Sequence, residues 1–286
     1  MTDVFDAFAK QHDFLICVDS DGCAMDTMNV KHIKCFGPCM VDEWKLDAWR
    51  EPILRRWNDS NLYTATRGVN RFRGLALNLS EVNAQYTPIA QVQELVNWVE
   101  TAGELSNDAL LRAAEAAAQK GGDAGTCLQK ALHWSRAVNA AIAALPEEDK
   151  RPFDGAAEGL AAAHRFADVA VVSSANRDAV LEEWSRYGLL SQVDLVLAQD
   201  AGSKAHCIAR LLQKGYDPQR VLMVGDAPGD RDAAQKNGVQ YYPILVRNEA
   251  QSWRELVQTA LPLLQSGEYA AYGAQKTEEF LRNLGG

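Results

Sequence analysis

A short apolar run that ends in acidic residues is the feature of this chain that most restricts its fold. Phe14–Val18 is apolar throughout, and Asp19 and Asp21 follow it directly. Such a run is typical of a strand buried on both faces, as in a parallel sheet. Ligands of open α/β sheets bind outside the carboxyl ends of the strands, where these acids would lie. A solvated turn explains Asp-Ser-Asp-Gly equally well, because these residue types favour turns.

Strand patterns return only far along the chain. Residues from about 28 to 151 have almost wholly helical patterning, whereas short apolar strands and amphipathic helices alternate after them. The later expected strands are 169–174, 194–199, 221–226 and 239–246. A βαβ connection needs only a few tens of residues, so a whole module must be inserted after the first strand. We therefore expect an α/β core with a doubly wound, Rossmann-like parallel sheet, formed by residues 1–27 and 152–286, and an inserted all-helical domain at 28–151.

The expected insertion is rich in tryptophan and contains a cluster of arginines. Five tryptophans lie there, and we expect them to form the core of the insertion rather than to line a pocket: Trp44, Trp49, Trp57, Trp98 and Trp134. Arg67 and Arg71 are four residues apart, so they would share one face of a helix. Arginine suits bidentate contacts with phosphate or carboxylate, and substrate binding by this pair is one interpretation. A solvated surface is the alternative.

Charge and apolar patterning argue against several classes of partner. The formal net charge is -9 and the pI is near 5.1, whereas nucleic acids are bound through basic surfaces. No apolar stretch has the length needed to cross a membrane, and the N-terminus lacks the features of a signal peptide. Six cysteines without disulfide-scaffold spacing favour a cytoplasmic protein. We therefore expect no nucleic-acid partner and no membrane association.

One cysteine cluster resembles a metal site only superficially. His32, Cys35 and Cys39 have no paired-cysteine spacing and no second pair nearby. Gly37 and Pro38 between the cysteines predict a turn that separates two buried thiols. We therefore expect core cysteines here and no zinc.

Four polar motifs follow apolar runs in the expected α/β core. If the sheet is parallel, several of these strand ends meet at one edge, and the carboxylates crowd together. Crowded carboxylates repel one another unless a cation neutralises them, and ligands that are all oxygen favour Mg²⁺. A lysine and a hydroxyl beside that cation suit a phosphoryl group. The motifs are, in order, Asp19 with Asp21, then Ser173, then Lys204, and last Asp226 with Asp230.

These motifs, their order and the long helical insertion after the first one resemble the haloacid dehalogenase superfamily. The resemblance implies that Asp19 is a nucleophile that forms an aspartyl-phosphate, and that Asp21 is the general acid and base. Cys23 stands where the family usually has threonine. The acid at position 21 favours phosphate esters over carbon–halogen bonds, because the dehalogenases usually carry tyrosine there.

The resemblance also assigns the remaining site residues. Ser173 would hold the phosphoryl oxygens, and Lys204 would stabilise the nucleophile and the phosphate. Ser174 and Asn176, beside Ser173, join the expected substrate-binding residues. The metal ligands would be Asp19, Asp226, the main-chain carbonyl of Asp21, and Asp230 in support.

The function expected from the sequence is a Mg²⁺-dependent phosphatase that hydrolyses a small phosphorylated metabolite through an aspartyl-phosphate. A phosphomutase of the same superfamily is one alternative. A non-catalytic module that binds a phosphorylated metabolite is the other. The sequence names no substrate and leaves the oligomeric state open.

Overall fold

The chain folds into two compact units. The computed structural model describes residues 4–285. One unit, which we call the α/β unit, contains the chain up to Met28 and from Glu147 onward, and the other, the helical unit, is Asn29–Pro146. The division drawn from the sequence placed its boundaries after residues 27 and 151.

The α/β unit is built on a parallel sheet whose centre is the first strand. The strand order is β3-β2-β1-β4-β5, and each neighbouring pair is parallel. The predicted α/β class with a doubly wound parallel sheet is therefore confirmed. The strands are β1 (Phe14–Val18), β2 (Ala167–Val172), β3 (Leu195–Leu197), β4 (Val221–Gly225) and β5 (Gln240–Pro243).

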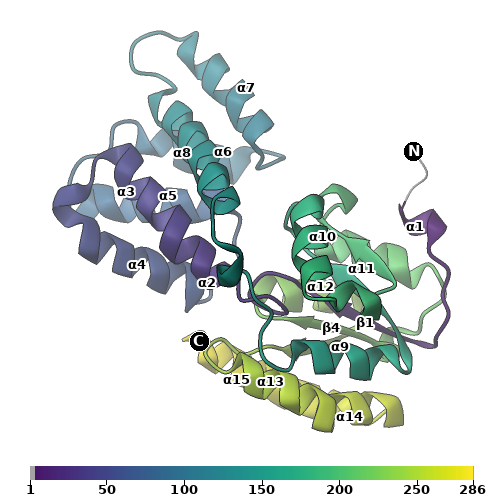
Figure 1. Ribbon diagram of the computed structural model, residues 1–286. Coiled ribbons are helices and arrows are strands. Elements are labelled where there is room, and N and C mark those ends of the chain that lie inside the picture. Colours follow the sequence, from purple (N-terminus) through teal and green to yellow (C-terminus); the bar gives the residue numbers. More distant parts are fainter. Residues whose placement is uncertain (1–3, 286) are drawn as a thin grey trace. The chain divides into compact units, whose positions relative to one another are not determined.

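Helices cover both faces of this sheet, which is why its strands are mostly apolar. Figure 1 shows α11 and α12 on one side of the sheet, and α9, α13 and α14 (Leu261–Ser266) on the other. Alternate strand residues such as Ile16 and Val169 pack in one cluster with Leu160 of α9, Trp184 of α10 and Trp253 of α13. The helices are α9 (Ala156–His164), α10 (Arg177–Arg186), α11 (Lys204–Leu212), α12 (Pro228–Asn237) and α13 (Glu249–Glu255).

A helical segment follows the last strand and packs back on the sheet. It consists of α13, a π-helical turn at Leu256–Ala260, α14 (Leu261–Ser266) and α15 (Tyr269–Asn283). We call α13–α15 the C-terminal helices. The hydroxyl of Tyr269 donates to the main-chain carbonyl of Tyr241 at 2.6 Å. The hydroxyl of Tyr242 donates to the main-chain carbonyl of Ser252 at 2.7 Å. These bonds tie the C-terminal helices to β5.

The helical unit has an apolar core rich in tryptophan. Trp57 and Trp134 are fully buried, Trp44 and Trp98 are nearly so, and Trp49 packs half-buried against the same cluster. The expectation that these rings form the core of the insertion is therefore confirmed. The helices are α2 (Met28–Lys31), α3 (Gly37–Trp44), α4 (Arg50–Leu62), α5 (Arg71–Gln85), α6 (Val92–Thr101), α7 (Asn107–Ala118) and α8 (Thr126–Ala143).

The predicted turn at Gly37 and Pro38 is wrong. A π-helical turn, His32–Phe36, joins α2 to α3, so the helical path continues through these residues. Pro38 is tolerated because it stands in the first turn of α3, where a missing N–H costs little. A Cβ at Gly37 would lie 2.9 Å from Cδ2 of Leu54, so glycine is needed for the close approach of α4. Cys35 is buried and Cys39 is partly buried.

Among residues 4–285, no helix combines the length and apolar character that crossing a bilayer requires.

Candidate active site

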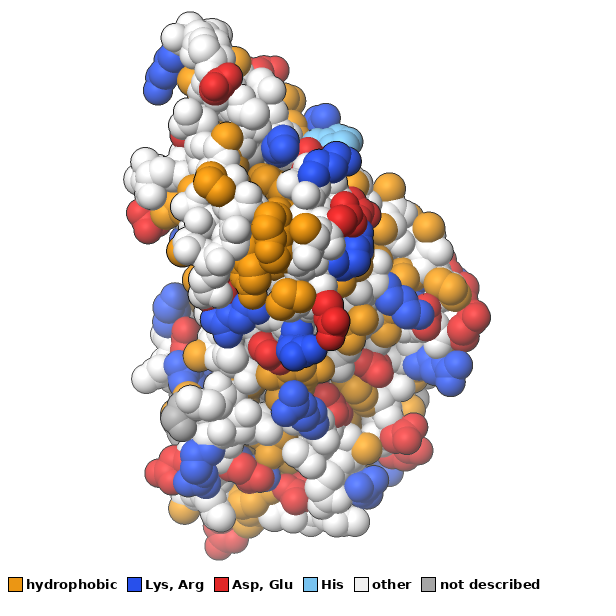
Figure 2. All heavy atoms as spheres, turned by 90° about the vertical axis from the view of Figure 1, so that its left-hand side faces the viewer, with side chains coloured by type: hydrophobic (Ala, Val, Ile, Leu, Met, Phe, Trp, Pro, Cys, Tyr) orange, Lys and Arg blue, Asp and Glu red, His pale blue; other side chains and the backbone are white. Residues whose placement is uncertain are grey.

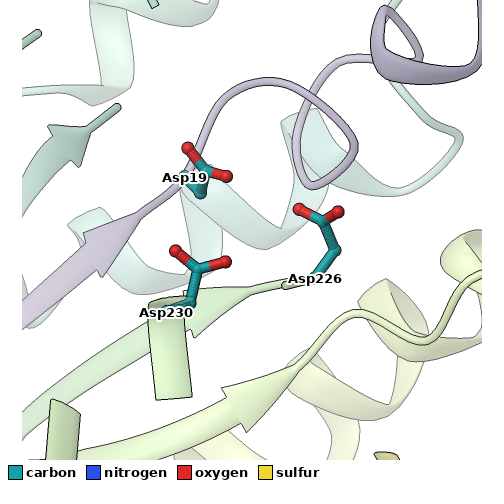
Figure 3. Close-up of side chains that lie close together, drawn as sticks. All are labelled: Asp19, Asp226 and Asp230. Carbon is teal, nitrogen blue, oxygen red and sulfur yellow. The ribbon is translucent and has the colours of Figure 1, made fainter. Parts of the chain in front are cut away.

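Three carboxylates meet at the carboxyl ends of β1 and β4. Asp19 directly follows β1, Asp226 directly follows β4, and Asp230 lies in the first turn of α12. One oxygen from each side chain lies within 4.8 Å of the others, and all three residues are buried. Figure 3 shows the three carboxylates turned toward a common space. The cluster arises because β1 and β4 are parallel neighbours, so their carboxyl ends coincide.

A lysine lies between two of these carboxylates. Nζ of Lys204 is 2.8 Å from Oδ2 of Asp19 and 2.5 Å from Oδ1 of Asp230. Lys204 is the first residue of α11, which Ser203 caps by accepting from the main-chain N–H of His206 at 3.2 Å. The cap therefore fixes the start of α11 and places the ammonium group at the cluster.

Burial dominates the electrostatics of this cluster. It raises the pKa of Asp19 to about 8, with Asp230 and Asp226 adding to the rise and Lys204 opposing it. Burial alone would lower the pKa of Lys204, but the charges of Asp19 and Asp230 raise it above its ordinary value. One lysine cannot balance three buried carboxylates. The remaining negative charge and the all-oxygen donor set fit a hard divalent cation such as Mg²⁺.

Asp230 reaches the cluster through two local features. Its Oδ2 accepts from the main-chain N–H of Ala227 at 3.0 Å, which closes the first turn of α12. A Cβ at Gly225 would lie 2.3 Å from Cγ of Asp230, so a larger residue there would displace the carboxylate. Sequence reasoning missed Gly225, although its position directly before Asp226 was the available signal.

The residues after Asp19 form a tight loop, residues 19–27, which we call the aspartate loop. Gly22 has φ 83°, a left-handed conformation that glycine adopts without strain. The main-chain N–H groups of Ala24 and Met25 donate to the carbonyl of Ser20 at 3.0 and 2.9 Å. The main-chain N–H of Asp19 donates to the carbonyl of Val224 at 3.0 Å, which attaches the start of the loop to β4.

A hydroxyl within the aspartate loop supports the second acid. The side chain of Thr27 donates to Oδ1 of Asp21. Thr27 is buried, while Asp21 is partly exposed. Asp21 stands apart from the three-carboxylate cluster, and a metal bond from its main-chain carbonyl stays a prediction. Sequence reasoning missed Thr27, because no spacing rule links a hydroxyl to an acid six residues before it.

Cys23 is a buried thiol behind the site. Its Sγ donates weakly to the carbonyl of Val224 at 3.6 Å. Burial, and then the charges of Asp226 and Asp19, raise the pKa of this thiol well above its ordinary value. A protonated, buried thiol is a poor nucleophile, so Cys23 has the character of a packing residue.

The serines after β2 differ in exposure. Ser173 is buried, and its Oγ accepts from the main-chain N–H of Ala175 at 3.1 Å. Ser174 is exposed. Asn176 caps α10, because its Oδ1 accepts from the main-chain N–H groups of Asp178 and Ala179 at 3.0 and 3.3 Å. The substrate contacts expected of Ser173, Ser174 and Asn176 stay predictions.

Arg67 and Arg71 do not share a helical face, so that expectation is wrong. Asn70 caps α5 by accepting from the main-chain N–H of Phe72 at 2.9 Å, and the helix begins only at Arg71. Arg67 is buried in the preceding turn, where it donates to the carbonyl of Leu62 at 2.8 Å.

Arg71 is held at the start of α5 by neutral groups of α8 and by an aromatic ring. It donates to Oδ1 of Asn139 at 2.7 Å and to Oγ of Ser135 at 3.2 Å, and its guanidinium lies 5.2 Å from the ring centre of Phe36. Burial lowers the pKa of Arg71. Substrate binding by either arginine stays a prediction.

His32, which lies near Cys35 and Cys39 in the sequence, contacts the apolar core of the helical unit. Nε1 of Trp57 donates to Nδ1 of His32 at 3.1 Å, and the His32 ring stacks on Phe36. Within the described part of the chain, the one group of three or more possible metal-binding residues is Asp19, Asp226 and Asp230.

Comparison with known proteins places the chain in a family. A model of the haloacid dehalogenase-like hydrolase family matches residues 101–244, which is just over half of the chain. The chain belongs to this family. The resemblance inferred from the motifs is therefore confirmed. Asp19 and the C-terminal helices lie outside the matched residues of this hydrolase family. The comparison with curated proteins found no relative.

Solved structures of similar fold come from several bacteria. One is a candidate phosphoglycolate phosphatase from Lactobacillus delbrueckii subsp. bulgaricus, with 11% identity, a TM-score of 0.50 and coverage of 81% of this chain and 85% of that one. Another is a haloacid dehalogenase-like hydrolase from Streptococcus pneumoniae, with 12% identity, a TM-score of 0.44 and coverage of 84% and 90%. At this identity, the first likeness shows a shared fold.

Proposed function

We propose that this protein is a Mg²⁺-dependent phosphatase that hydrolyses a small phosphorylated metabolite through an aspartyl-phosphate on Asp19. The observation that carries the proposal is the partly buried Lys204, which bridges Asp19 and Asp230 beside Asp226. Phosphoryl transfer spreads negative charge over the phosphoryl oxygens, and catalysis consists mainly of positioning groups and stabilising that charge. A lysine and a cation-binding carboxylate cluster supply this stabilisation together.

The chain's own residues account for each bond change. A carboxylate oxygen of Asp19 attacks phosphorus, and the bond from phosphorus to the ester oxygen breaks. Asp21, oriented by Thr27, gives its proton to the leaving alkoxide. Asp21 then takes a proton from the water that attacks the aspartyl-phosphate, which releases phosphate and restores Asp19. Lys204 holds Asp19 in position and neutralises part of the developing charge.

Asp19, Asp226 and the Asp21 carbonyl would hold Mg²⁺, with Asp230 in support, and the ion would neutralise charge on the phosphoryl oxygens. Ser173 would donate to those oxygens, and Ser174 and Asn176 would contact the substrate nearby. Arg67 and Arg71 remain candidates for substrate recognition. Arg71 is the better candidate. Burial among neutral partners lowers its pKa because it disfavours the charged guanidinium, and a bound anion would offset this penalty on the charge.

Other features support the proposal more broadly. The Lactobacillus delbrueckii structure is that of a candidate phosphoglycolate phosphatase, which agrees with phosphatase activity but names no substrate for this chain. All six cysteines are free thiols, which suits a cytoplasmic protein. A small phosphorylated metabolite is the proposed partner.

Release of phosphate from 4-nitrophenyl phosphate tests the proposal. We expect turnover with Mg²⁺ and none after chelation with EDTA, with activity restored by adding Mg²⁺. A panel of phosphorylated metabolites then separates the alternatives. Inorganic phosphate as product supports a phosphatase, and an isomeric phosphate ester supports a phosphomutase. Binding of panel members without any product would identify a binding module and overturn the proposal.

A further inference from the structure

Two buried indoles hold the aspartate loop from different elements of the α/β unit. Nε1 of Trp184, in α10, donates to Oγ of Ser20 at 2.9 Å. Nε1 of Trp253, in α13, donates to the main-chain carbonyl of Cys23 at 3.0 Å. Ser20 lies between Asp19 and Asp21, and Cys23 follows shortly after. Both indoles are fully buried, so water does not compete for these bonds.

Two glycines leave room for Trp253: Gly159 in α9, and Gly155 directly before this helix. A Cβ at Gly159 would lie 2.3 Å from Cε3 of Trp253, and a Cβ at Gly155 would lie 3.0 Å from its Cβ. The indole can therefore pack this closely against α9 only because Gly155 and Gly159 have no side chains. Its close packing fixes the direction of the N–H, which points to the Cys23 carbonyl. Trp253 also lies outside residues 101–244, the range that the family model matches.

Main-chain hydrogen bonds attach the aspartate loop to β4 and to residues 151 and 153, and the two indoles add side-chain donors at Ser20 and Cys23. The loop is a turn with a left-handed glycine, and it carries both acids of the proposed reaction. A buried carbonyl without a donor costs free energy comparable to a lost hydrogen bond. Removing the indole N–H therefore favours conformations in which the Cys23 carbonyl reaches water, and these move Asp19 and Asp21 relative to Lys204.

We infer that Trp184, in α10, and Trp253, in the C-terminal helices, are positioning residues that hold the aspartate loop in its reactive geometry, so that turnover depends on both of these elements. This inference rests on the proposed phosphatase function for its catalytic part. The indoles donate to Ser20 and Cys23 rather than to Asp19 or Asp21. Each indole acts through a hydrogen bond to the loop that carries these acids.

Hydrogen exchange of the loop amides, in Mg²⁺-free buffer, tests the anchoring without any need for activity. Trp253→Phe keeps the apolar ring but removes the N–H donor. We expect amides of residues 19–27 to exchange about 5- to 30-fold faster, the factor that loss of one buried hydrogen bond gives. Amides of Phe14–Val18 should exchange as in the wild type.

Tyr269→Phe is the matched control. It removes a buried hydrogen bond from the same C-terminal helices, but its hydroxyl bonds to β5 rather than to the loop. We expect it to leave loop exchange within twofold of the wild type. Equal acceleration in the control and in Trp253→Phe would show general loosening and would overturn the inference.

Turnover of 4-nitrophenyl phosphate tests the catalytic part. Trp253→Phe should lower kcat about tenfold at saturating Mg²⁺ and leave KM within twofold, because the loop carries the reacting groups. Tyr269→Phe should leave both constants near the wild-type values. An unchanged kcat in Trp253→Phe overturns the catalytic part. If the wild type itself hydrolyses no phosphate ester, the proposed function fails, while loop exchange still decides whether the indoles anchor the loop.

Ser20→Ala serves if Trp253→Phe does not fold. It removes the acceptor of Trp184 with a small change in volume, and we expect the same local acceleration of loop exchange. If the loop amides exchange at the wild-type rate in both Ser20→Ala and Trp184→Phe, the inference that two indoles hold the loop is overturned.

Discussion

Charge balance is what distinguishes Asp19 from an ordinary buried acid. It lies beside Asp226 and Asp230, Lys204 contacts two of the three carboxylates, and burial raises the pKa of Asp19 to about 8. Such an arrangement is costly for stability and is expected at a functional site rather than in a structural core. Thr27 and Gly225 contribute indirectly, because one orients Asp21 and the other leaves room for Asp230.

Asp19→Asn separates the chemical role of this residue from its structural one. The amide keeps the shape and removes one of three crowded charges, so the free energy of unfolding without metal should stay within about 1 kcal/mol of the wild type. Turnover should fall on the order of 10⁴-fold or more, because the nucleophile is gone. Asp154→Asn, at an exposed position, is the control and should change neither. Near-native turnover in Asp19→Asn would rule out the proposed nucleophile.

Cys23 allows a test of whether a cysteine, rather than Asp19, is the nucleophile. Its pKa is raised and its side chain is buried, so the thiol stays protonated at neutral pH and inaccessible to reagents. Mass spectrometry should therefore find no alkylation of Cys23 by iodoacetamide in the native protein, and complete alkylation after denaturation. Cys23→Ser should retain turnover within about tenfold. Loss of turnover on native alkylation of Cys23 would instead support a cysteine nucleophile.

At the scale of elements, strands and motifs were predictable, whereas contacts between distant segments were not. Phe14–Val18 is apolar at every position because helices cover both faces of the sheet, so its pattern identified the central strand. The π-turn before Pro38 has no sequence signature that separates it from a loop. Asn70 is the cap of α5, so the helix begins after Arg67, and spacing alone does not reveal this boundary. Trp253 contacts a loop 230 residues away, and no periodicity encodes such a contact.

The two arginines of the helical unit should respond differently to replacement. Arg67→Ala leaves the buried Leu62 carbonyl without this donor and should lower the free energy of unfolding by about 1–3 kcal/mol in chemical denaturation. Arg71→Ala should destabilise less, because its partners are neutral side chains. If Arg71 recognises substrate, its loss should lower kcat/KM for the true substrate by about 1.5–3 kcal/mol and spare a small aryl phosphate. Equal losses on both substrates would indicate a structural role.

At the scale of the whole molecule, the chain has more acidic than basic residues. On the face drawn in Figure 2, basic and acidic side chains are interspersed around a group of apolar ones, and no broad basic region is visible. The net charge of -9 is in keeping with a small-molecule substrate rather than a nucleic acid. The proposed function depends on one local group of buried acidic side chains, the carboxylate cluster.

Cation binding at that cluster should stabilise the α/β unit. A ligand that binds only the folded state adds about 2.7 kcal/mol of stability at a concentration 100 times its Kd. Calorimetry should therefore show a rise in Tm with added MgCl₂, which Asp226→Asn removes and the exposed-site control Asp154→Asn retains. An identical rise in both variants would mean that Mg²⁺ acts elsewhere.

The most direct test of the central claim is capture of the phosphorylated enzyme. Asp21→Asn, which keeps the nucleophile but lacks the acid and base, is mixed with 4-nitrophenyl phosphate and Mg²⁺, quenched in acid, digested and analysed by mass spectrometry. We predict one phosphoryl group on Asp19, accumulating in Asp21→Asn and present only briefly in the wild type. We also predict no phosphoryl group when Asp19 is replaced by asparagine. Phosphate release by the wild type with no phosphorylated peptide, or with the phosphoryl group on another residue, would contradict the account.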